Sequence, residues 1–423
     1  AAIDTKIESV GNGWYRCSVT SIFADNQYFV SVADGSADIN GTIGTSLYIQ
    51  SAQLESGLAA TDVLTSGTTT AKSGVLIDLP RINFDANGEN GALLLEPSRV
   101  NNFNYSEYSA AIEYNNVNSI TNNAAISPEG VQNALEINAD GNDIVDSYRS
   151  AGSGVVGTFS VFAKAGTGDS IRMSHSSTGS SAYTDFNLTS GTRISTGGAQ
   201  YINSDIKDYG NGWYRISITF TSGTGGYINR LTLQDTGVYQ IYGFQLEAGS
   251  YVSSYIPNHS GTGGVTRAAD SCSGSGNSEV FNDSEGVLFI EAATLSELDI
   301  TARYFQLSDG TITANGITFR YYTTTNYFQA LYYTGGAYQA VLSVFLSDSS
   351  QFNKIAYKYK ANDFALWVNG VKIGTDTSGN TGAVLSNLNF NNNGYDGFEG
   401  KTKQLLYFNE ALSDSELATL TTL

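Results

Sequence analysis

The chain has 423 residues, of which 41% are hydrophobic, and this length is sufficient to bury two or three separate cores. Its 40 acidic and 21 basic residues give a net charge of −19. Nucleic acids and anionic membrane surfaces bind through Lys and Arg, so we expect neither as a partner. The sequence contains no run of about 18 apolar residues, so we expect no insertion into a membrane.

The composition is rich in glycine and aromatic residues, with 46 Gly, 27 Tyr and 20 Phe against 4 Pro. Aromatic and β-branched side chains suit pleated strands, and Gly, Asn and Asp supply the turns between them. The sequence therefore predicts an all-β protein whose helix is limited to one or two turns near the C-terminus. Cys17 and Cys272 are the two cysteines, and we expect no disulfide framework from them.

One motif occurs twice along the chain. Residues 11–16, Gly-Asn-Gly-Trp-Tyr-Arg, recur at 210–215, and each copy is followed by Gln-Leu-Glu, at 53–55 and at 245–247. The copies are offset by 213 − 14 = 199 positions at the tryptophan and by 246 − 54 = 192 at the leucine, so they differ by one loop. They represent one module used twice. The first copy lacks the strand-like residues that precede the second, so we expect the chain to start inside a domain.

Turns and polar stretches divide the chain into five segments. Residues 1–57 hold the C-terminal part of a first jelly-roll module, and 58–100 form a linker with connecting strands. A second jelly-roll module spans 101–258; a Gly/Ser-rich linker spans 259–284 and a last domain 285–423. Short strands bounded by turns, such as residues 157–164, are typical of such sandwiches.

The last domain contains two strong local signals. Asn369-Gly370 lies between alternating strands and predicts a two-residue hairpin, because both central residues of a type I′ turn need positive φ. Ser413 precedes Glu416 by three residues, which predicts a capping box at the start of a short helix. We therefore expect a β-sandwich closed by one terminal helix.

Several motifs follow one another in a recognisable order. They are Leu-Leu-Leu-Glu-Pro-Ser-Arg at 93–99, Tyr-Ser-Glu at 105–107, the second Gly-Asn-Gly-Trp-Tyr-Arg, Gln-Leu-Glu, and Thr-Arg-Ala-Ala-Asp at 266–270. This order resembles that of tail and fibre-type virion structural proteins of tailed bacteriophages, although Val100-Asn101 stand where that family usually has Thr-Asn. Trp-Val-Asn-Gly at 367–370 and the closing Leu-Ser-Asp-x-Glu-Leu are similar to a concanavalin A-like or laminin G-like sandwich.

The resemblance implies a bacteriophage protein on the virion surface, in a tail fibre, a tail spike or a capsid appendage. It also implies that the jelly-roll modules, including the one at 101–258, are similar to carbohydrate-binding modules. Such a protein would present glycan-binding modules for attachment to host cell-surface glycans, alongside other virion proteins. We expect a homo-oligomer, a trimer about a fibre axis. Two alternatives stay open: an accessory carbohydrate-binding region of a secreted polysaccharide-degrading enzyme, and a structural spacer or capsid decoration that binds no ligand.

The candidates for glycan binding are Trp213, Arg215, Tyr322, Tyr333 and Tyr338. Strand alternation places Trp213 and Arg215 on the outer face, where they bind a glycan or pack under a loop. We favour packing, because the tryptophan recurs together with its complete turn. Outward tyrosines of residues 321–338 suit a glycan platform and a subunit interface equally well.

No catalytic constellation stands out. Glycoside hydrolysis needs a pair of carboxylates, and Glu136 with Asp140 is an isolated pair. His175 and His259 are the two histidines, too few for a histidine zinc site. We therefore expect no enzymatic activity and no cofactor, except that the loops at 85–90 and 138–143 offer oxygen ligands for a structural calcium ion.

Overall fold

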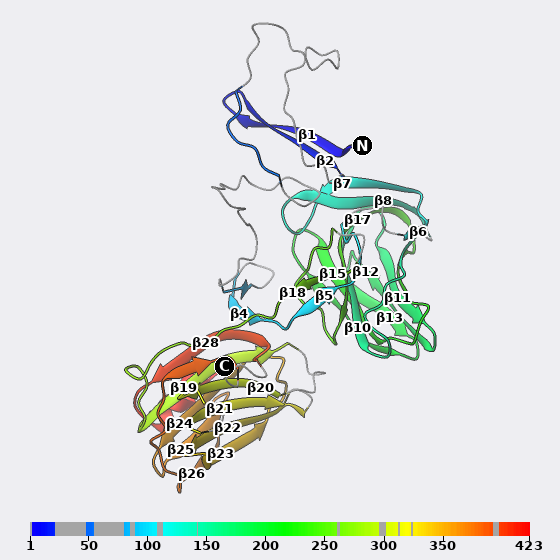
Figure 1. Ribbon diagram of the computed structural model, residues 1–423. Coiled ribbons are helices and arrows are strands. Elements are labelled where there is room, and N and C mark those ends of the chain that lie inside the picture. The colour runs from blue at the N-terminus through cyan, green and yellow to red at the C-terminus, as the bar shows by residue number, and fades with distance from the viewer. Residues whose placement is uncertain are drawn as a thin grey trace.

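The computed structural model describes residues 2–21, 48–54, 80–84, 89–107, 113–141, 143–259, 263–295, 302–311, 314–322, 325–391 and 397–423. Within these ranges nearly all regular structure is strand, and the one helix lies at the C-terminal end (Figure 1). The described strands form six antiparallel sheets; the four larger ones pack into two β-sandwiches, and the other two are two-stranded. The predicted all-β class is therefore confirmed.

The first of these, the central sandwich, is made of twelve strands between residues 113 and 248. They are β6 (Glu113–Asn116), β7 (Ser119–Ile126), β8 (Gln132–Asp140), β9 (Asp143–Ser147), β10 (Val156–Ala165), β11 (Ser170–Ser177), β12 (Ser180–Asn187), β13 (Thr192–Gly197), β14 (Tyr201–Asp208), β15 (Trp213–Thr221), β16 (Ile228–Leu233) and β17 (Thr236–Ala248). One sheet has the order β14-β15-β10-β17-β8-β7, and the other has the order β13-β12-β11-β16-β9-β6. Alternate residues such as Phe159, Val161, Ile216 and Ile218 are fully buried between the sheets.

The C-terminal sandwich packs a seven-stranded sheet on a five-stranded sheet. Its strands are β3 (Ile82–Asn83), β4 (Ala92–Leu95), β19 (Glu285–Thr294), β20 (Ala302–Ser308), β21 (Gly316–Tyr322), β22 (Tyr327–Thr334), β23 (Ala337–Phe345), β24 (Asn353–Lys360), β25 (Phe364–Val368), β26 (Val371–Asp376), β27 (Asn387–Asn389) and β28 (Gly400–Phe408). The larger sheet runs β26-β25-β24-β19-β28-β4-β3, and the smaller runs β23-β22-β21-β20-β27. Helix α1 (Asp414–Thr421) covers the outer face of the larger sheet, where Leu417 packs against Phe289 and Trp367.

Both local predictions for this domain are confirmed. Asn369 and Gly370 have φ of 50° and 82° and connect β25 to β26 by a two-residue turn. Ser413 is the N-cap of α1, its side chain accepts from the backbone N–H of Glu416, and the Glu416 carboxylate accepts from the N–H of Ser413.

The two copies of the repeated motif form hairpins of the same register. In β1 (Ala2–Gly11) and β2 (Trp14–Ser21), Ile7 is opposite Cys17. In β14 and β15, Ile206 is opposite Ile216, which is the same pairing at an offset of 199. The turn residues Asn12 and Asn211 have φ of 51° and 52°. The repeated sequence therefore specifies one local structure twice.

The described part of the segment at 58–100 carries strands, and connecting strands were expected there. The segment at 259–284, expected to be a Gly/Ser-rich linker, also contains a strand, which was not expected. β3 and β4 extend the larger sheet of the C-terminal sandwich through β28. β5 (Arg99–Asn101) pairs with β18 (Val265–Arg267), so the two segments are hydrogen-bonded to each other between the sandwiches. Residues 58–79 lie outside the described residues. Of the strands that follow, β4 and β5 pair with β28 and β18, which lie far away in sequence, and β3 pairs with β4.

The motifs behind the phage resemblance meet at this junction and at the end of the central sandwich. Glu96 accepts from Arg81 at 2.8 Å and from Arg267 at 2.5 Å. Asn101 donates to the carbonyls of Phe244 and Ile256, which holds the last strand of the central sandwich. Further contacts of the same kind come from Ser106, Gln245 and Glu247. The side chains of these motifs therefore form hydrogen bonds and ion pairs that hold distant backbone segments together.

Candidate functional site

The outer face of the five-stranded sheet carries a regular array of aromatic and polar side chains. The inner residues of its strands, such as Phe305, Phe319 and Phe328, are buried in the core, so the alternate residues point outward. Cross-strand pairing arranges these outward residues in four rows: Tyr322, Tyr327 and Phe345; Tyr304, Arg320, Gln329 and Ser343; Gln306, Thr318, Leu331 and Val341; and Tyr333 with Tyr338. We use the name tyrosine face for seven of its exposed and half-buried members: Tyr304, Arg320, Tyr322, Tyr327, Gln329, Tyr338 and Phe345.

Arg320 lies at the middle of the tyrosine face. Its Nη1 donates to the Tyr322 hydroxyl at 2.9 Å and to Gln329 Oε1 at 3.4 Å, and its guanidinium lies over the rings of Tyr304 and Tyr322. Burial alone would lower the pKa of Arg320, but the hydrogen bond to Tyr322 and the neighbouring tyrosines outweigh burial and raise it. The face therefore holds one fixed positive charge surrounded by aromatic rings.

The most exposed aromatic side chains of the face are Tyr338, at 63%, and Phe345, at 73%. Both belong to β23, and a bulge between them places them opposite Tyr333 and Tyr327, which are 333 − 327 = 6 residues apart, or roughly 20 Å along a strand. At the Phe345 end, Tyr327 packs on Phe345 with ring centroids 4.9 Å apart and on Tyr322 at 5.9 Å. The face is therefore long and open, with apolar rings at both ends and polar groups at its centre.

Tyr333 was a predicted glycan-binding residue, and the structure corrects this. It is 4% exposed, and its hydroxyl binds Gln306 Nε2 at 2.6 Å and Thr318 Oγ1 at 2.7 Å. Burial raises the pKa of Tyr333. Its ring meets Tyr338 edge-on with centroids 6.2 Å apart. Tyr333 therefore supports Tyr338 from below, while Tyr322 and Tyr338 lie on the surface as predicted.

Trp213 and Arg215 are also unavailable to a surface ligand. Trp213 is 2% exposed, packs against Phe162 and Tyr242, and donates from Nε1 to the Ile126 carbonyl at 3.1 Å. Arg215 is 6% exposed and donates to the Ser253 carbonyl at 2.7 Å. Both do lie on the outer face of β15, but other parts of the module cover this face. The packing interpretation is therefore correct and the glycan-binding one is wrong for these two residues.

Sequence reasoning missed Tyr304, Arg320, Gln329 and Phe345. Each lies on a strand that alternates between apolar and polar or aromatic residues, and this alternation marks an outward face. The sequence does not say which residues of neighbouring strands stand side by side, because that depends on the register between β20, β21, β22 and β23. Arg320 meets Tyr304 and Gln329 as a result of that register.

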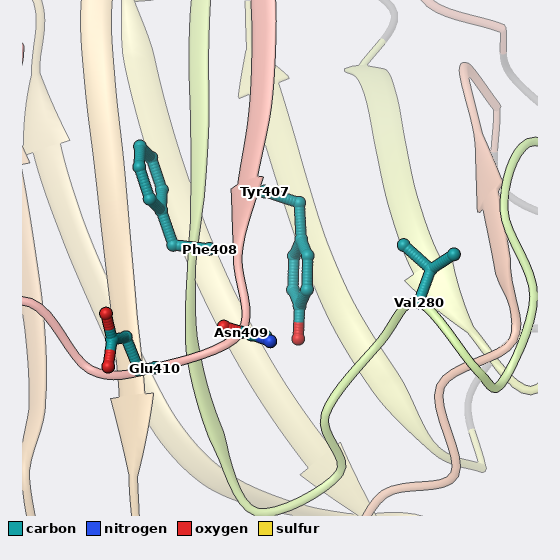
Figure 2. A pocket seen from close by; sticks show the side chains of 5 residues that line it. All are labelled: Val280, Tyr407, Phe408, Asn409 and Glu410. Atoms are coloured by element: carbon teal, nitrogen blue, oxygen red, sulfur yellow. The ribbon is translucent and has the colours of Figure 1, made fainter.

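A cavity of about 330 Å³ lies elsewhere, beside the end of β28. Figure 2 shows Tyr407 and Val280 on one side of Asn409, and Phe408 and Glu410 on the other. The Tyr407 hydroxyl accepts from the Asn282 backbone N–H at 2.6 Å and bonds Tyr359 at 2.8 Å. The Tyr407 hydroxyl, the main polar group of the cavity, is therefore engaged in packing the loop at 277–284.

The remaining polar candidates serve the fold. His175 is 2% exposed, stacks on Phe220 and bonds Asn229 and Ser177, and burial lowers its pKa. Asp143 belongs to the loop that was expected to offer ligands for calcium. Its carboxylate accepts from the backbone N–H groups of Asn118 and Asp140, so it stabilises the backbone of this loop and its neighbour. The other loop falls largely on residues 85–88, which lie outside the described residues.

Among described side chains, no group of three His, Cys, Asp or Glu residues is arranged to hold a metal ion. The described part of the chain also contains no helix long and apolar enough to span a membrane.

No protein-family model and no curated protein matches the chain. Among solved structures, the chain is similar to the CBM40 module of the Ruminococcus gnavus IT-sialidase, with 17% identity and a TM-score of 0.30 over 36% of this chain and 97% of that one. It is similar to the heptameric SAP-like pentraxin of Limulus polyphemus, with 10% identity, a TM-score of 0.29 and coverage of 36% and 74%. It is also similar to domains LG4-5 of the mouse laminin α1 chain, with 9% identity, a TM-score of 0.24 and coverage of 65% and 89%. These likenesses are partial and assign no function.

Proposed function

We propose that this protein binds carbohydrate through the tyrosine face and catalyses no reaction. The observation that carries the proposal is the array of exposed and half-buried aromatic rings around Arg320 and Gln329. Sugar sites combine apolar surface, on which a ring stacks, with a few polar groups that fix its hydroxyls. The tyrosine face offers both in one plane, and its polar groups are held by hydrogen bonds before any ligand arrives.

An extended, uncharged polysaccharide fits this face better than a single sugar. Tyr338 and Phe345 lie roughly 20 Å apart along the sheet, a length that spans several sugar rings. The net charge of −19 repels polyanions at long range, and Arg320 is the one cation of the face. The affinity would then come from several weak stacking contacts along one polymer chain, and not from one deep pocket.

The setting that we propose is the surface of a bacteriophage virion, in a tail fibre, tail spike or capsid appendage that attaches to host glycans. This part of the proposal is supported by the motif order at residues 93–107 and 266–270. A trimer would present three tyrosine faces and would raise avidity by about 10² to 10⁴ where their spacing matches the polymer. Light scattering at micromolar concentration tests the trimer, and a monomer alone would contradict it.

A polysaccharide array tests the binding proposal. The full-length chain is applied to neutral and acidic bacterial surface polysaccharides, and bound samples are then assayed for new reducing ends. We expect binding to neutral polymers and no increase in reducing ends. A rise in reducing ends would show catalysis, and a complete lack of binding would favour a structural spacer.

A further inference from the structure

The hairpin β1–β2 carries on its surface the pattern that is buried in the matching hairpin of the central sandwich. In β14–β15, the residues that face the core are Ile206, Tyr214, Ile216 and Ile218. Their counterparts in β1–β2, which have the same register, are Ile7, Tyr15, Cys17 and Val19. Ile7, Tyr15 and Val19 are 60 to 68% exposed, and Cys17 is also exposed. The same face is therefore core in one copy and surface in the other.

The edge of β2 differs in the same way. In the central sandwich β10 lies between β15 and β17, with Phe159 opposite both Ile218 and Leu246. Residues 48–54 are the counterpart of 240–246 in β17, at the offset of 192. Ile49 is 60% and Leu54 is 74% exposed, whereas their β17 counterparts are fully buried. Residues 48–54 are not in a strand, but in sequence they correspond to the second neighbour of a β10-type strand. Among the described residues, β2 pairs with β1 alone.

We propose that β1–β2 and residues 48–54 are the acceptor half of an incomplete β-sandwich, which is completed by strands of the β10 to β13 type. The occupant is a polypeptide segment with the sequence chemistry of residues 156–197. Its first strand pairs antiparallel with β2 and presents alternate apolar side chains, as Phe159 and Val161 do. The β10 strand of the central sandwich is excluded as the occupant, because β15 and β17 already bond both of its edges.

The internal repeat provides a direct test. Since the offset is 199, Ala1 corresponds to Gln200, so an additional copy of residues 101–199 is fused directly before Ala1 of the full-length chain. Cys272→Ala leaves Cys17 as the single thiol. Because the counterpart Ile216 is fully buried, we expect the fusion to slow the reaction of Cys17 with an aromatic disulfide reagent by at least about tenfold.

The matched control carries Phe159→Asp and Val161→Asp in the added copy alone, and we expect Cys17 to react as fast as in the unfused chain. Circular dichroism and the thermal transition of the original sandwiches verify that all three proteins are folded. Two results would overturn the proposal. One is an equal Cys17 rate in the fusion and in its control. The other is slow Cys17 reaction in the unfused chain together with a dimer in light scattering, which would make a second copy the occupant.

Discussion

Glu96 and Arg267 are 171 positions apart in the sequence and form an ion pair of 2.5 Å between the two sandwiches. The Glu96 side chain is 4% exposed and also accepts from Arg81 and from the backbone N–H of Ser254. Arg81 in turn pairs with Asp270. The motifs at residues 93–99 and 266–270 therefore meet in one buried cluster, and their structural role is to join the central sandwich to the C-terminal one.

Replacing Glu96 by Gln should weaken this junction strongly. The change removes the buried charge that two half-buried guanidinium groups share, and breaking a buried pair costs up to about 3 to 5 kcal/mol. Denaturant unfolding followed by near-ultraviolet circular dichroism measures this loss. The control is Asp414→Asn, which removes an exposed pair with Lys372 and should cost no more than about 1 kcal/mol. Equal effects of the two changes would show that the junction cluster is not important for stability.

The same junction should weaken in acid. Burial alone raises the pKa of Glu96, but Arg267 and Arg81 outweigh burial and hold the pKa below its usual value of 4.5. A carboxylate with a lowered pKa stabilises the fold at higher pH and loses this contribution as the pH falls. We therefore expect the stability difference between wild type and Glu96→Gln to be largest near neutral pH and to shrink as the pH falls below about 4.5. A difference that is independent of pH down to about 2.5 would contradict the ion-pair account.

The two tryptophans of the repeated motif should respond differently to the same substitution. Trp213 is 2% exposed and Trp14 is 41% exposed, although both follow the same turn. Trp213→Ala leaves a cavity and should cost about 3 to 5 kcal/mol, whereas Trp14→Ala should cost less than about 1 kcal/mol. Thermal unfolding of both variants measures the contrast. Similar losses would show that the first hairpin is already packed in the protein.

Local signals in the sequence predicted local structure well. The Asn369-Gly370 turn and the Ser413 capping box depend on a few adjacent residues, and both are present as predicted. The all-β class and the equal structure of the two hairpins follow from composition and repetition. By contrast, the burial of Trp213 depends on Ile126 and Phe162, which lie in other strands, and no pattern around residue 213 contains this information.

The candidate site was predicted in part for the same reason. Tyr322 and Tyr338 were identified because tyrosines crowd into this region, but alternation alone does not separate them from Tyr333. Tyr333 points to the same face, but its hydroxyl binds Gln306 and Thr318, and a bulge in the β22–β23 pairing places Tyr338 opposite it. Arg320 is one cation in a long strand sequence. Its importance appears only when the register places it between Tyr304 and Gln329.

The substitution Tyr333→Phe tests whether Tyr333 stabilises the tyrosine face or itself binds polysaccharide. The change removes a buried hydroxyl that serves Gln306 and Thr318, and leaving these partners without it should cost about 1 to 3 kcal/mol. The ring remains, so Tyr338 keeps its edge contact, and polysaccharide binding should stay within about twofold of wild type at a temperature where both are folded. Denaturant unfolding and titration calorimetry give the two values. A tenfold loss of binding without a loss of stability would place Tyr333 in the binding site itself.

The most direct test of the central proposal compares two exposed tyrosines. Tyr338 lies on the tyrosine face and is 63% exposed, and Tyr148 lies on the central sandwich and is 47% exposed. Titration calorimetry measures each alanine variant with the neutral polysaccharide that binds best on the array. The proposal predicts that Tyr338→Ala weakens binding by about tenfold, equivalent to about 1.4 kcal/mol, and that Tyr148→Ala leaves it unchanged. Equal affinity of the two variants and wild type would contradict carbohydrate binding by this face.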